Sequence, residues 1–151
     1  MLSSLLLAVA IIAHEPGYYT SLANHVQRWL KQERIAARVT TPREMSTALA
    51  KERLAFLVGF SNPSAAEVKT LRNFRARGGR LVVFYSASPA LADLMGVKPV
   101  GYVAAPYPGA YSRMTFSTAT PVGLPSSILQ TSTVLQRARP ITGRSRVIAT
   151  W

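Results

Sequence analysis

The spacing of apolar residues along the chain changes between a helical period and short unbroken runs. Over residues 18–33 it predicts an amphipathic helix whose apolar face is formed by Leu22, Val26, Trp29 and Leu30. The run LAFLVGF at residues 54–60 has no alternation, which is typical of a strand covered on both faces of a parallel sheet. A second buried strand is predicted at residues 80–85, and further strands are expected at residues 9–14 and 35–40.

Capping residues mark the ends of the remaining predicted helices. Pro42 suits the first turn of a helix. Ser64 and Glu67 have the spacing of a capping box, and the helix that they begin ends before a pair of glycines. Ser88 can cap a further helix, which Gly96 closes. Because strands and helices alternate with short connections, we expect a flavodoxin-like, three-layer α/β/α fold with a mostly parallel sheet.

The pattern changes after Val100. Residues 104–113 are rich in proline and tyrosine and are expected to form an ordered loop. Short strands are predicted at residues 114–117, 128–135 and 146–151. We therefore expect an α/β domain over residues 9–100 and a loop and β-rich extension of the same domain over residues 101–151. The apolar final residues favour a chain truncated at its C-terminus.

The first residues allow two interpretations. The apolar run at residues 5–13 lacks the basic residues of a signal peptide and is too short to span a bilayer as a helix, so no transmembrane helix is expected. It could be an export signal or the first strand of the fold. We favour a strand from residue 9, with residues 1–8 as the remnant of a signal. This interpretation implies an exported or cell-envelope protein, and a cytoplasmic location is the alternative.

Composition restricts the possible chemistry. Lys and Arg number 18 against 6 Asp and Glu, a formal net charge of +12, but the basic residues form no long run. We therefore interpret them as an arginine-rich surface, and nucleic acid is not the expected partner. The absence of cysteine excludes disulfides, thiolate metal sites and a cysteine nucleophile. Neither a G-x-G-x-x-G fingerprint nor a P-loop occurs, and we expect no cofactor and no metal.

Polar residues follow the predicted strands where a ligand would bind. These candidates are His14 and Glu15 after the first strand, Asn62 and Ser64 after the third, and Tyr85, Ser86 and Ser88 after the fourth. Because the carboxyl ends of parallel strands meet at one edge of the sheet, we expect these groups to converge on a polar or anionic ligand. Tyr107, in the later loop, could fold over them.

Ser86 and Ser88 lie at a strand-to-helix elbow, where some α/β hydrolases hold a nucleophile. Neither serine has the flanking glycines of the G-x-S-x-G elbow. A catalytic dyad of Ser86 as nucleophile and His14 as its base is conceivable, but only Asp93 could complete a triad. Catalysis by this chain alone is therefore not expected, and any activity would be that of a hydrolase.

The run GGRLVVFYSASPALADLMGV at residues 78–97 resembles the strand, elbow and helix of class I glutamine amidotransferase-like domains. In that family a nucleophilic cysteine ends the strand, and the resemblance places this position at Tyr85, or at most at Ser86. Because the chain has no cysteine, the resemblance implies a domain without amidotransferase activity. A closer resemblance covers residues 56–102, 123–140 and 146–151 and is to amidotransferase-like domains of bacterial exported proteins of glycoside-hydrolase-like family ten.

This resemblance implies an amino-terminal fragment of a larger exported protein, with a further domain beyond Trp151. Our leading hypothesis is a non-catalytic domain that binds carbohydrate or serves a structural role between domains. Two alternatives stay open. One is a hydrolase that uses Ser86 and His14, and the other is a module that binds anions or nucleic acid.

Overall fold

The computed structural model describes residues 9–14, 17–86, 88–117 and 123–151. The chain divides into two compact units, Met1–Leu91 and Ala92–Trp151, and the boundary falls inside helix α4 (Pro89–Met95). The expected signal remnant at residues 1–8 and the candidate Glu15 both lie outside the described residues. Of the helices that the structure describes, none is long and apolar enough to cross a membrane.

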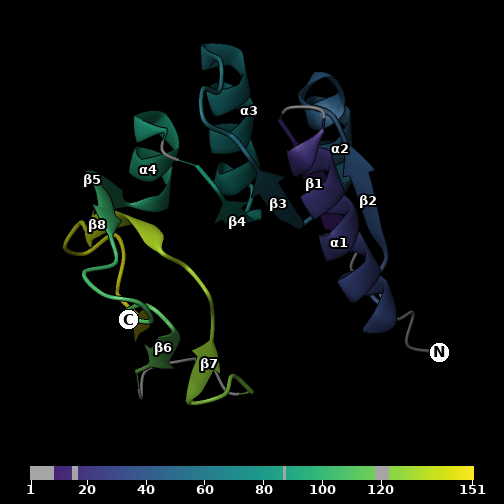
Figure 1. The fold of residues 1–151 in the computed structure, drawn as a ribbon. Coiled ribbons are helices and arrows are strands. Elements are labelled where there is room, and N and C mark those ends of the chain that lie inside the picture. Colours follow the sequence, from purple (N-terminus) through teal and green to yellow (C-terminus); the bar gives the residue numbers. More distant parts are fainter. Residues whose placement is uncertain (1–8, 15–16, 87, 118–122) are drawn as a thin grey trace. The chain divides into compact units, whose positions relative to one another are not determined.

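A four-stranded parallel sheet forms the centre of the first unit (Figure 1). In chain order this unit contains β1 (Val9–Ala13), α1 (Tyr18–Gln32), β2 (Ala37–Thr40), a 3-10 turn (Pro42–Glu44), α2 (Met45–Lys51), β3 (Leu54–Val58), α3 (Ala65–Ala76) and β4 (Arg80–Phe84). The strands lie in the order β2-β1-β3-β4, and each neighbouring pair is parallel. This is the flavodoxin-like strand order. The predicted fold class is confirmed.

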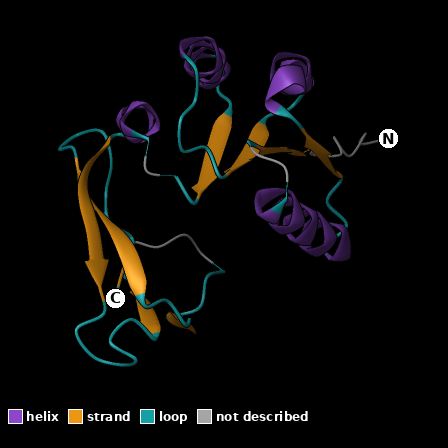
Figure 2. Ribbon diagram, turned by 45° about the horizontal axis from the view of Figure 1, so that its top comes forward, coloured by secondary structure: helices purple, strands orange, loops and turns teal. Residues whose placement is uncertain are grey.

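Helices cover both faces of this sheet (Figure 2). Helix α1 packs against β1, β2 and β3, whereas α2 and α3 contact each other on the opposite face. The direction of the crossovers explains this division, because right-handed connections place a helix on one face when the chain moves from β1 to β2. The helix lies on the other face when the chain moves from β2 to β3 and on to β4. The result is the expected α/β/α arrangement.

Helix α1 turns a narrower apolar face to the sheet than the spacing of its residues predicts. Leu22, Val26 and Leu30 pack against the core that β1 contributes. Trp29, which the sequence places on the same face, is 61 % exposed. Since Leu22, Val26 and Leu30 are each separated by four residues, they form one row on the helix, and Trp29 lies beside that row.

Helix α3 and strand β4 follow the sequence prediction in position. The buried residues of α3 are Val68, Leu71 and Phe74, whose spacing of three residues places them on one side of the helix. The sequence predicts a buried β4, but its residues are half-buried or exposed. Among the described strands, β4 is an edge strand that pairs with β3 alone. The prediction of a strand here is confirmed, but the prediction that it is buried was wrong.

The second unit contains two small antiparallel sheets. One pairs β5 (Val97–Ala104) with β8 (Val134–Pro140), and the other pairs β6 (Arg113–Phe116) with β7 (Ser127–Leu129) and β9 (Ala149–Thr150). The sequence pattern does not predict β5, and the strand expected at residues 128–135 is divided between β7 and β8. Among the described residues of this unit, Leu94 is the one buried hydrophobic side chain. These sheets are therefore short of apolar core.

Candidate functional site

The carboxyl ends of β1 and β3 lie side by side at the point where the strand order of the sheet reverses. Residues after these two strands are His14 and the pair Gly59 and Phe60. The backbone N–H of His14 donates to the carbonyl of Val58 at 3.1 Å, which continues the pairing of the two strands beyond β1. In open α/β sheets, ligands bind in the crevice at such a switch point. The sequence predicts His14 at this edge, where the structure has it.

His14 is held between an aromatic ring and a carboxylate. Its ring lies 4.8 Å from that of Phe60 between centroids, tilted by 55°. Its Nε2 atom lies 3.8 Å from Oε2 of Glu67, and both side chains are 18 % exposed. The Nδ1 atom is buried without a hydrogen-bond partner among the described residues. One ring nitrogen of His14 therefore remains to be satisfied by a group that the described residues do not supply.

Glu67 has two roles at this edge. It completes the predicted capping box of α3, since its carboxylate accepts a hydrogen bond from the Ser64 backbone N–H at 2.6 Å. Its own backbone N–H donates to the Ser64 hydroxyl at 3.3 Å. An acidic residue in the first turn of a helix stabilises that helix. The sequence shows the capping box but not the approach of Glu67 to His14, because that contact joins residues from different elements.

A cavity of about 680 Å³ opens at the carboxyl ends of β1 and β2. Its lining residues are Ala13, His14, Thr20, Val39, Thr40, Thr41, Pro42, Arg43, Glu44 and Glu67. The fold brings two acidic residues from different elements, Glu44 and Glu67, to this one cavity. The buried Thr40 hydroxyl donates to the Glu44 carboxylate at 2.6 Å, which fixes this acid at the rim. The cavity therefore combines two carboxylates, an imidazole, a guanidinium and threonine hydroxyls.

The chain turns sharply after β4, and the hydroxyl groups of the two serines in this elbow form hydrogen bonds within the protein. Tyr85, the first residue after β4, has a φ of 54°, in the left-handed region that non-glycine residues rarely adopt. The Ser86 hydroxyl donates to the Phe60 carbonyl at 2.5 Å and accepts from the Ser88 backbone N–H at 3.2 Å. The Ser88 hydroxyl in turn accepts from Leu91 N–H at 3.4 Å, as its predicted capping role requires. Both serines thus shape the turn and the start of α4.

The other sequence candidates are spread over the molecule. Asn62 and Ser64 are exposed in the loop before α3. Within the described part of the chain, no hydrogen bond joins Ser86 to His14, so the couple required for a serine hydrolase is not formed. Tyr107 belongs to the second unit, where it is 65 % exposed and begins a turn through its carbonyl, which accepts from Ala110 N–H at 3.1 Å.

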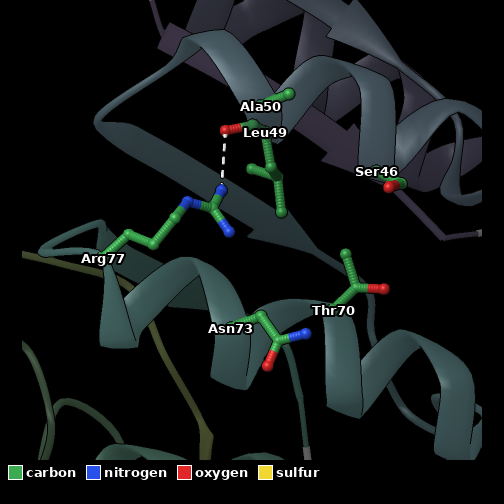
Figure 3. Close-up of a pocket in the computed structure, with 6 residues that line it drawn as sticks. All are labelled: Ser46, Leu49, Ala50, Thr70, Asn73 and Arg77. Carbon is green, nitrogen blue, oxygen red and sulfur yellow. Dashed lines mark hydrogen bonds between the residues drawn. The ribbon is translucent and has the colours of Figure 1, made fainter.

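A second hollow lies between α2 and α3, and one of the side chains that line it caps the end of α2 (Figure 3). It has a volume of about 370 Å³, and its lining residues are Ser46, Leu49, Ala50, Thr70, Asn73 and Arg77. Arg77 extends from the end of α3 and donates to the Leu49 carbonyl in the last turn of α2 at 3.4 Å. A cation beside the carbonyl end of a helix is a stabilising arrangement. We therefore assign this hollow a structural role.

Metal binding finds no support in the described residues, because no group of three or more His, Cys, Asp or Glu side chains could hold an ion.

Comparison with solved structures identifies the class of fold. A ThuA-like protein from Bacteroides uniformis superposes with a TM-score of 0.65 at 14 % identity, over 87 % of this chain and 61 % of that one. An exo-β-1,4-mannosidase from Opitutaceae bacterium strain TAV5 gives a TM-score of 0.62 at 13 % identity, over 91 % and 26 % of the two chains. A GMP synthase protein from Thermoplasma acidophilum gives a TM-score of 0.56 at 11 % identity, over 95 % and 72 %.

These similarities define a flavodoxin-like domain compatible with the class I amidotransferase-like type. The chain spans about three fifths of the ThuA-like structure and about a quarter of the mannosidase. At the level of sequence, no protein-family model and no curated protein matches it. The likeness thus concerns the fold, and function has to be argued from the site.

Proposed function

We propose that this protein is a non-catalytic amidotransferase-like domain that binds a carbohydrate in the cavity at β1 and β2. The observation that supports this most is the meeting of Glu44 and Glu67 with His14 at one cavity. A volume of about 680 Å³ falls within the range of small-molecule sites.

The chemistry of the lining suits a ligand with many hydroxyl groups. Ionised carboxylates accept hydrogen bonds through two oxygens, and those to charged acceptors are stronger than neutral ones. Threonine hydroxyls both donate and accept, so Thr41 can follow either polarity of a sugar hydroxyl. The buried Nδ1 of His14 adds one more group that a ligand hydroxyl, or a water beside it, could satisfy.

Binding without catalysis is favoured by the state of the elbow. The chain lacks cysteine, and Tyr85 stands where related domains hold it. The Ser86 hydroxyl is used within its own turn. The fold is also similar to part of an exo-β-1,4-mannosidase, which fits a role in carbohydrate recognition.

A glycan array followed by calorimetry tests the proposal. We expect the full chain to bind a neutral oligosaccharide, and Glu44→Gln or Glu67→Gln to weaken binding by about 10- to 150-fold, the loss of a charged hydrogen bond worth about 1.5–3 kcal/mol. Glutamine can still accept from Thr40 or complete the capping box, so the fold should be retained. Glu33→Gln, at the end of α1, is the matched control. A blank array, or an equal loss in the control, would refute carbohydrate binding at this cavity.

A further inference from the structure

The second unit has a large excess of positive charge. Residues 92–151 contain one lysine and five arginines, and Asp93 is their one acidic residue. Asp93 is engaged by Arg144, whose Nη1 lies 3.0 Å from its carboxylate. The remaining cations of this unit therefore have no further acidic side chain of their own unit to pair with.

Three of these cations share one face of the β5–β8 ribbon. Lys98 lies directly opposite Arg139, and Arg137 lies opposite Gly101. Directly opposite residues of an antiparallel pair point to the same face, as do residues two apart on one strand. Lys98, Arg137 and Arg139 therefore form a single basic face. All three are exposed, and none makes an ion pair with a described residue.

This arrangement is unfavourable for the ribbon in isolation. Like charges directly opposite each other across two strands destabilise their pairing, and Lys98 with Arg139 is such a pair. An anion that touches both side chains would remove that repulsion. The basic face is thus better suited to a bound state than to a free one.

Space for a ligand is present beside Arg137. Its cross-strand neighbour Gly101 has no side chain, and a Cβ atom there would meet no other atom within 4 Å. The register of β5 also shifts between Pro99 and Gly101, where the extra residue forms a bulge. A glycine inside a strand often marks a bulge or a place where another backbone can approach closely.

We propose that this basic face of the β5–β8 ribbon binds the phosphate backbone of a single-stranded nucleic acid. Arginine forks match phosphate oxygens in a bidentate manner. Arg137 and Arg139 are two residues apart on β8, a separation of about 6.8 Å along the strand, and Lys98 faces Arg139, so the three can contact successive phosphates of a flexible chain. The proposal concerns another unit than the carbohydrate cavity, and either can fail without the other.

The test measures binding of a fluorescent oligo(dT) of about 20 nucleotides by anisotropy at several salt concentrations. Three phosphate contacts predict a slope of log K against log salt of about −2.1, so affinity should fall about 18-fold between about 50 and about 200 mM salt. For Arg137→Gln with Arg139→Gln, one contact remains. The slope should then be about −0.7 and the loss about 2.6-fold over the same interval.

Two further variants separate the basic face from net charge and from misfolding. Arg28→Gln with Arg38→Gln removes the same charge from exposed positions of α1 and β2 and should leave the slope unchanged. Arg137→Lys with Arg139→Lys keeps the charge and should retain the salt dependence. The proposal is overturned if oligo(dT) does not bind at the lowest salt, or if both glutamine pairs reduce the slope equally. Binding of polygalacturonate but not of oligo(dT) would also overturn it and would assign the face to an acidic polysaccharide.

Discussion

Gly59 follows β3 directly and lies beside the residues that shape the candidate site. Its φ is +74°, and a Cβ atom built on it would lie 2.4 to 2.7 Å from ring atoms of Tyr19. Tyr19 packs against the core from α1. The next residue, Phe60, contacts the ring of His14 and accepts the hydrogen bond of Ser86. Gly59→Ala should therefore disturb both the packing of α1 and the carboxyl edge of the sheet.

The expected cost has two separate parts. An alanine in the left-handed region loses about 1–2 kcal/mol relative to the favoured regions. A methyl group forced into a packed contact costs about a further 1–3 kcal/mol, since the Tyr19 ring has to move. The sum is about 2–5 kcal/mol, against a total stability of about 5–15 kcal/mol for a typical domain. The variant should be folded but markedly less stable.

Urea unfolding followed by far-UV circular dichroism measures this loss. With an m value of about 2 kcal/mol/M, the midpoint should fall by about 1–2.5 M. Gly78→Ala is the matched control, because Gly78 has a φ of +86° and no atom within 4 Å of a built Cβ. It should lose the backbone part alone, about 1–2 kcal/mol. Equal losses in the two variants would show that the contact with Tyr19 has no energetic weight and would refute the packing argument.

Two further predictions concern the capping residues and the elbow. Ser64→Ala removes the side-chain half of the capping box and should lower the free energy of unfolding by about 0.5–2 kcal/mol in thermal melts; no change would mean that the cap contributes nothing. Ser86→Ala removes the donor to Phe60 and the acceptor for Ser88 and should cost about 1–3 kcal/mol. In the unmodified protein a fluorophosphonate probe should leave Ser86 unlabelled, and labelling there would contradict its assignment to the turn.

Much of the first unit follows from local patterns. The unbroken apolar run of β3 predicts a strand covered on both faces, and its residues after Phe56 are buried. Ser64 and Glu67 predict the start of α3, and both hydrogen bonds of the capping box are formed. These features depend on residues close together in the sequence. They could be predicted because helix caps and apolar periodicity act over a few residues.

The second unit is harder to predict from the same signals. Strand β5 contains Pro99 and Gly101, residues that weaken a strand prediction, and a bulge between them accommodates the irregular register. Its pairing with β8 joins residues thirty or more positions apart, which no local pattern specifies. The opposition of Lys98 and Arg139 is a consequence of that register.

The sequence by itself determined the order of strands and helices along the chain in the first unit, the capping of α3 and the cap of α4 at Ser88, because each of these follows from neighbouring residues. Tertiary structure alone decided which distant groups meet. Glu67 reaches His14 because β1 and β3 are adjacent in the sheet, and Glu44 lines the same cavity because β2 lies on the other side of β1. The elbow serines likewise became part of a turn through the carbonyl of Phe60, a residue of another strand end. The chemistry of this edge is set by strand order, and strand order is fixed only when the sheet is assembled.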